Sequence, residues 1–105
     1  MNRPVRISRL AALDLQQARD WFDQREDGLG DKFLGSVEQA LERISANPEQ
    51  YAVALLDLRR APIRPFHYSL FYRVLPDESI VVAALSDRRD LPVARRRALR
   101  PVEPT

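Results

Sequence analysis

The hydrophobic pattern of the chain changes its period near the middle, at Asn47-Pro48, and this change limits the folds that are open to it. Before this point apolar residues recur every three or four positions, which is typical of helices that bury one face. After it they alternate or run without interruption, as they do in strands. Helices followed by strands, rather than alternating with them, predict an α+β fold.

The helical half contains two predicted helices. The first follows Ser8, a residue type that caps helix N-termini, and ends near Arg25. The second begins around Asp31 and ends at Asn47, because a proline disfavours helix at the residue before it. A glycine-containing turn at 27–30 separates the two, so we expect an antiparallel two-helix hairpin.

The remaining elements are predicted strands and one short helix. Residues 5–7 indicate an N-terminal strand, and three later segments, at about 59–63, 66–74 and 80–85, indicate a three-stranded antiparallel meander. The last of these is apolar throughout, which is typical of a strand buried on both faces. Pro92 favours the start of a short C-terminal helix.

The strand at 66–74 shows the clearest alternation. One face holds Phe66, Tyr68, Leu70, Tyr72 and Val74, which we expect to pack on the core. The other face is mixed, and we expect it to meet solvent or a partner. Its members are His67, Ser69, Phe71 and Arg73.

Length and composition set further bounds. The chain has 105 residues, which suits one domain at 1–100 with a flexible tail at 101–105. It has no cysteine and one histidine, so disulfides and thiolate sites are excluded, and we expect neither a metal nor a cofactor. No signal peptide or membrane-spanning run is evident, so we expect a cytoplasmic protein without a membrane partner.

Positive charge is concentrated in the strand half. Residues 1–50 carry seven basic and nine acidic side chains, a balance of −2, whereas residues 51–105 carry ten and six, a balance of +4. Two interpretations stay open: the arginines of this half gather as a phosphate site, or they pair with Asp57, Asp87 and Asp90. The arginines concerned are Arg59, Arg60, Arg64, Arg73, Arg88 and Arg89.

Several short segments, in their order and spacing, resemble the RelE/ParE superfamily of type II toxin–antitoxin toxins, and most closely its ParE-like, plasmid-stabilisation branch. The resemblance runs from the first strand to Arg89. It rests on segments Ala12–Leu15, Trp21–Phe22, Leu29–Phe33, Leu41–Ile44, Asn47–Tyr51, Arg64–Val74 and Ala84–Asp90.

The resemblance implies a small toxin that a cognate antitoxin neutralises by covering the helical hairpin and the sheet. We expect Leu13, Trp21, Phe33 and Val37 to contact that antitoxin. ParE-like toxins inhibit DNA gyrase, whereas RelE-like toxins cleave mRNA on the ribosome. For the target, or for an anion, the expected contacts are Arg64, Arg73, Arg88 and Arg89.

The residues favour the ParE-like activity over RNA cleavage. Cleavage needs a group that protonates the leaving oxygen, and no tyrosine, histidine or lysine follows Arg88. We therefore expect a gyrase inhibitor that is not an enzyme. The alternatives are a degenerate, non-toxic module member and an mRNA interferase, in which the phosphate would be held by Arg59, Arg64, Arg73 and Arg88.

Overall fold

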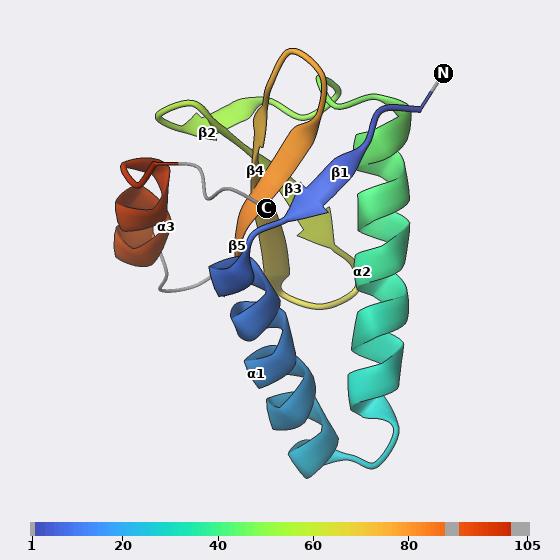
Figure 1. The fold of residues 1–105 in the computed structure, drawn as a ribbon. Coiled ribbons are helices and arrows are strands. Elements are labelled where there is room, and N and C mark those ends of the chain that lie inside the picture. Colours follow the sequence, from blue (N-terminus) through green and yellow to red (C-terminus); the bar gives the residue numbers. More distant parts are fainter. Residues whose placement is uncertain (1, 88–90, 102–105) are drawn as a thin grey trace.

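The computed structural model describes residues 2–87 and 91–101, which form three layers around one mixed sheet (Figure 1). The strand order is β1-β5-β4-β3-β2, in which β1 runs parallel to β5 and every other neighbouring pair is antiparallel. The strands are β1 (Val5–Ile7), β2 (Val53–Leu55), β3 (Leu58–Ile63), β4 (Tyr68–Val74) and β5 (Ser79–Ser86).

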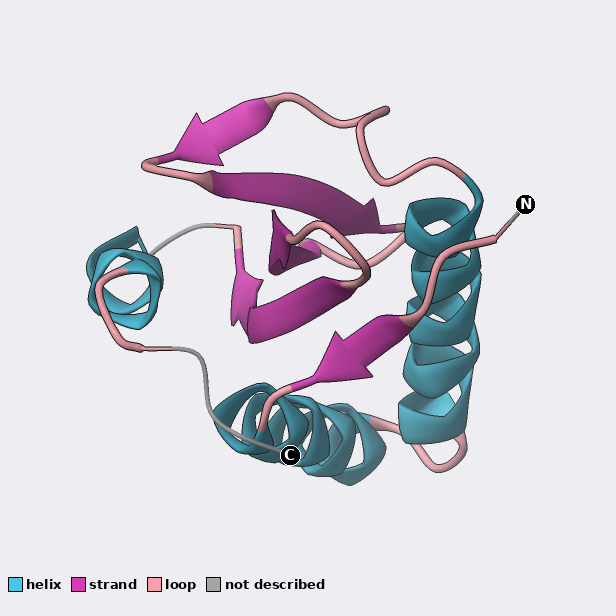
Figure 2. Cartoon of the chain, turned by 45° about the horizontal axis from the view of Figure 1, so that its top comes forward, coloured by secondary structure: helices cyan, strands magenta, loops and turns pink. Residues whose placement is uncertain are grey.

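Two long helices cover one face of the sheet and a short helix lies against the other. Helices α1 (Arg9–Arg25) and α2 (Leu29–Ala46) form the hairpin, and α3 (Leu91–Ala98) lies across the sheet from them (Figures 1 and 2). Two separate apolar clusters follow from this arrangement, one under the hairpin and one under α3. The predicted α+β architecture is confirmed. The meander contains one strand more than expected, the short strand β2.

Local signals set the ends of the helices. The Ser8 Oγ accepts a hydrogen bond from the Ala11 amide at 3.1 Å and so caps α1, as expected. Gly28 has φ +85°, a conformation that glycine adopts without strain, and it precedes α2. At Gly30 a Cβ would lie 2.7 Å from the Arg19 carbonyl oxygen, so glycine lets the two helices approach closely.

The second face of β4 corrects an expectation. Its mixed residues were expected at a surface, yet Ser69 is fully buried and Phe71 is 4% exposed. Helix α3 covers Phe71 with Ala94 and Ala98, which belong to the same apolar cluster, and Ser69 is bound by Arg60 and Asp87. Only His67, in the turn before the strand, is exposed as expected.

Tyr72 ties the sheet to the end of the hairpin. Its side chain is fully buried, and its hydroxyl donates a hydrogen bond to the Pro48 carbonyl at 2.5 Å. Burial raises the pKa of Tyr72 to about 12, since the charged form would lose its hydration there. The phenol therefore stays protonated and serves as a structural donor.

The hairpin core should respond to truncation very differently from its surface. Phe33 is fully buried and contacts the rings of Phe22, Phe66 and Tyr68, whereas Trp21 is 45% exposed. We expect Phe33→Ala to lower the free energy of unfolding by about 3–5 kcal/mol in denaturant titrations. Trp21→Ala, the matched control, should cost about 1 kcal/mol or less. Equal losses would contradict this placement of the core.

Candidate functional site

The free edge of β5 is held by side chains instead of a strand. Strand β1 pairs with β5 only as far as Val81. Beyond that point Arg97 of α3 donates to the Val82 carbonyl at 2.8 Å, and the Ala84 amide donates to Asp14 of α1 at 3.1 Å. These two groups would otherwise be open to a further strand.

Asp14 and Arg97 also bind each other. The guanidinium of Arg97 donates to both carboxylate oxygens of Asp14, at 2.9 and 3.0 Å, and the side chains of Asp14 and Arg97 are only 12% and 15% exposed. A bidentate pair of this kind is both strong and directional. It joins α1, β5 and α3, and we call it the edge clamp.

A groove continues along the same edge beyond the clamp. It has a volume of about 240 Å³ and lies between α1 and the C-terminal part of β5. Leu13 and Trp21, 47% and 45% exposed, lie along α1, and the guanidinium of Arg25 lies 4.1 Å from the centre of the Trp21 ring. The lining residues are Asp14, Gln17, Ala18, Trp21, Tyr68, Ala84 and Leu85.

The four residues expected at the antitoxin contact therefore divide into two pairs. Leu13 and Trp21 are exposed and accessible to a partner. Phe33 and Val37 are 0% and 3% exposed and belong to the core under the hairpin, so in this structure they cannot be touched by a partner. Their apolar stripe on α2 packs against the sheet and α1, which corrects the expectation for these two.

The expected arginine cluster is not assembled by the described residues. Arg59 is paired across the sheet with Tyr72 and shares its hairpin side, where it donates to the Tyr51 carbonyl at 2.6 Å. Arg73 lies on the α3 side and donates to the Ala98 carbonyl at 2.7 Å. Arg64 is in the turn between β3 and β4, beyond the opposite end of β4 from Arg73. Arg88 and Arg89 lie outside the described residues.

Arg73 is also neutralised. It forms a two-point ion pair with Asp57, and its own side chain is only 12% exposed. The hydrogen bond from Arg73 lowers the pKa of Asp57 below its ordinary value. Arg73 is thus a structural residue in the free chain, and the ion-pairing interpretation of the basic half holds at this position.

A second set of linked polar side chains lies where β3 and β5 end and β4 begins. Arg60 donates from Nε to the Ser69 Oγ at 3.0 Å, and Ser69 donates to the Asp87 Oδ1 at 2.7 Å. Arg60 and Asp87 also form an ion pair at 3.0 Å. Sequence reasoning named Asp87 as an ion-pair partner, but it missed Ser69, because the alternating pattern placed that residue on an open face.

Beside this network lies a basic hollow of about 250 Å³ at the β3–β4 turn. Arg64 is exposed there and makes no hydrogen bond or ion pair with any described residue. His67 lies on the rim, and its carbonyl accepts from the Asp87 amide at 2.9 Å. With one free guanidinium, the hollow can bind an anionic group by charge. Its lining residues are Arg60, Pro62, Arg64, Pro65, Phe66, His67 and Asp87.

Two other kinds of site are not found among residues 2–87 and 91–101. No group of three histidine or acidic side chains is placed to hold a metal ion. None of the helices in these ranges is long and apolar enough to cross a bilayer.

The N-terminal strand, the helical hairpin, the antiparallel meander and the short C-terminal helix match a RelE/ParE-like fold, and solved structures agree. The structure described as the chromosomal ParDE TA system from P. aeruginosa matches with a TM-score of 0.71 at 16% identity, covering 80% of this chain and 95% of that one. The crystal structure of a copper-bound mutant toxin from Helicobacter pylori matches with a TM-score of 0.50 at 21% identity, covering 85% and 98%.

Comparison by sequence identifies the family. The sequence family described as the ParE toxin of the type II toxin–antitoxin system, parDE, matches residues 5–92 of this chain. A search of curated proteins finds no significant match. Because the family model covers well over half of the chain, this protein belongs to the ParE toxin family, as the resemblance implied.

The Asp57–Arg73 pair should give stability a dependence on acid pH. The folded-state pKa of Asp57 is below its ordinary 3.8, so the stabilisation is complete above that value and is lost as the pH falls through the lowered pKa. At neutral pH the free energy of unfolding of wild type should therefore exceed that of Asp57→Asn, by under about 1 kcal/mol because the carboxylate is half exposed. This difference should shrink below about pH 4. Asp77→Asn, which removes an exposed carboxylate elsewhere on the surface, is the control in urea titrations across pH. A difference that is independent of pH would refute the pairing.

Proposed function

We propose that this chain is the toxin of a type II toxin–antitoxin module, that it acts by binding DNA gyrase in the cytoplasm, and that a cognate antitoxin silences it. The observation that carries the proposal is the family match over residues 5–92, which spans the hairpin, the sheet and the start of α3. The matched structure of a ParDE system supports the same fold.

The groove beside α1 is the best candidate for the antitoxin contact. Leu13, Gln17 and Trp21 are spaced by four residues, so they form one stripe along α1. Gln17 and Trp21 line the groove, and Leu13 continues the stripe one turn before Gln17. Tryptophan and leucine that are exposed together beside a hollow suit a partner's apolar side chains. Because Phe33 and Val37 are buried, the proposal rests on Leu13 and Trp21 alone.

The basic hollow is the best candidate for the target contact. Arg64 is exposed and without a described partner there, while Arg73, which we also expected at the target, is held by Asp57. Arg88 and Arg89 follow Asp87 directly in the sequence, and we include them on that ground alone. A single free arginine beside a hollow is suited to an acidic protein surface.

The same geometry argues against the mRNA interferase. Such an enzyme would need several guanidiniums around one phosphate, but Arg59 and Arg73 lie on opposite faces of the sheet. The sequence also has no tyrosine, histidine or lysine after Arg88 that could donate a proton. Without such a donor, a reaction that depends on one would slow by about a hundredfold or more.

Parallel assays of gyrase supercoiling and of ribosome-bound mRNA test the proposal. We expect the purified chain to inhibit supercoiling and to leave mRNA intact, with Arg64→Ala reducing inhibition about tenfold and Lys32→Ala, on α2, leaving it unchanged. Site-specific cuts in mRNA would establish the interferase instead. Inactivity in both assays together with intact antitoxin binding would identify a degenerate module member.

Antitoxin binding should depend on the α1 stripe. The double variant Leu13→Ala/Trp21→Ala should weaken binding of the antitoxin encoded beside this chain by about thirtyfold or more in calorimetry, because a buried tryptophan anchor contributes about 2 kcal/mol or more. Val53→Ala, which removes an equally exposed apolar residue from β2, is the matched control. Unchanged affinity in the double variant would exclude this groove as the antitoxin contact.

A further inference from the structure

Within the described segment 91–101, helix α3 and the residues that follow it carry charged side chains that are all arginines. Arg95, Arg96 and Arg100 are exposed, and none forms a hydrogen bond or ion pair through its side chain with a described residue. The described segment 91–101 contains no acidic residue. We call these three arginines the α3 basic face.

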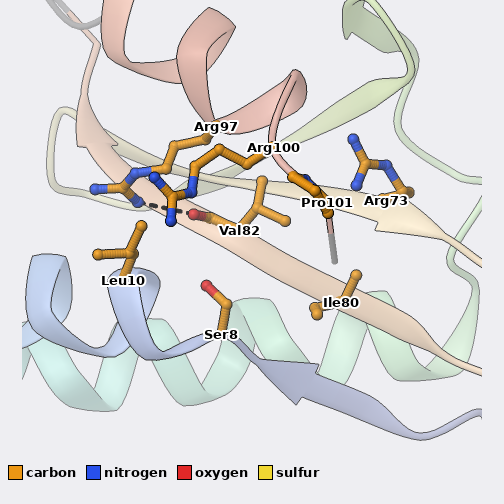
Figure 3. A pocket seen from close by; sticks show the side chains of 8 residues that line it. All are labelled: Ser8, Leu10, Arg73, Ile80, Val82, Arg97, Arg100 and Pro101. Atoms are coloured by element: carbon orange, nitrogen blue, oxygen red, sulfur yellow. Dashed lines mark hydrogen bonds between the residues drawn. The ribbon is translucent and has the colours of Figure 1, made fainter. Parts of the chain in front are cut away.

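Packing of α3 determines the direction of this face. Ala94 and Ala98, 0% and 8% exposed, pack on the sheet in the second apolar cluster. Since each residue turns the helix by about 100°, Arg96 points away from that contact and Arg95 points to the side of it. Arg100 follows the last turn and lies next to Arg97 above Val82, in the cleft that also contains Arg73 and Pro101 (Figure 3).

Two described carboxylates that bind arginines beside this face are already paired. Asp14 is bound to Arg97 in the edge clamp, and Asp57 is bound to Arg73. These two arginines therefore contribute little net charge, and the three of the basic face are left uncompensated. The result is a local surface of one sign, which attracts a polyanion over a range set by the salt concentration.

The exposed leucines of α3 do not turn this face into an apolar docking strip. Leu91 and Leu99 are 64% and 69% exposed, but they lie at the two ends of the helix, about 12 Å apart along its axis. Arg95 lies between them. A bilayer or an apolar groove would require a continuous apolar strip, which this arrangement does not provide.

We propose that the α3 basic face binds the phosphodiester backbone of double-stranded DNA without sequence preference. Arginine forks match phosphate oxygens in two-point hydrogen bonds. Arg95 and Arg96 are exposed neighbours on α3, and Arg100 lies just beyond its end. Duplex DNA presents one charge about every 1.7 Å of its axis, so each arginine has phosphates within reach. Contacts of this kind fix position and carry no base readout. This surface does not include Arg64, the described residue of the proposed gyrase contact, and the proposal does not depend on that contact.

Salt-dependent binding of a short labelled DNA duplex tests the proposal by fluorescence anisotropy. Wild type should bind at low salt, with affinity falling steeply as salt rises, because phosphate contacts release counterions. Arg95→Ala/Arg96→Ala should weaken binding at low salt about tenfold or more and reduce the slope of log K against log salt by about two. Arg100→Ala, placed beyond the end of the helix, should reduce it by about one.

The matched control removes the same formal charge from the hairpin. Arg19→Ala/Lys32→Ala takes two exposed cations from α1 and α2 and should retain the wild-type slope. If the control variant loses as much affinity for the duplex as the α3 variant, the effect comes from net charge alone and the proposal is overturned. Failure of wild type to bind the duplex would also overturn it, as would tighter binding to polyglutamate or to anionic vesicles than to DNA. Circular dichroism of each variant confirms that α3 still forms.

Discussion

The ion pair between Asp14 and Arg97 holds the three layers of this protein together at one point. Asp14 comes from α1 and Arg97 from α3, and both also bind backbone groups of β5, which lies between β1 and β4 in the sheet. Strand β5 has a parallel partner only as far as Val81, so its edge would otherwise end in open hydrogen-bonding groups. The clamp satisfies two of these groups and fastens the short helix α3, together with the packing of Ala94 and Ala98 on the sheet.

The sheet half of the chain uses its arginines mainly as internal ties. Arg59 holds the segment after α2, Arg60 joins β3 to the end of β5, and Arg73 joins β4 to the β2–β3 turn and to α3. Each is bound to a carbonyl, a hydroxyl or a carboxylate of the same chain. Among the described residues of this half, the exposed cations that remain are Arg64 on one side and the α3 basic face on another, and we assign both to partners.

Local patterns were sufficient to predict most of the fold. The helical periods, the Ser8 cap, the glycine turn and the uninterrupted apolar run at 80–85 each reflect interactions within a few residues. The buried second face of β4 was not predictable in this way, because a helix far along the chain covers it. Phe33 and Val37 show the same limit: the stripe of α2 was recognised, but not that the sheet would occupy it.

The candidate sites were predicted less completely, for a related reason. Leu13, Trp21 and Arg64 are exposed as a contact requires. The edge clamp joins residues 83 positions apart, and no local pattern indicates that Asp14 and Arg97 meet. Arg59 pairs with Tyr72 across the sheet and so lies on the same face as Tyr72, whereas Arg73 lies on the other face. The sequence alone did not reveal this strand register.

Hydrogen exchange followed by mass spectrometry tests the edge clamp most directly. In Arg97→Met, which keeps much of the length of the side chain but removes its charge, peptides from α3 and from the 82–86 part of β5 should exchange much faster than in wild type, while the α1–α2 hairpin stays protected. If α3 in the variant is as protected as in wild type, the clamp is not what fastens it, and this account of the fold is wrong.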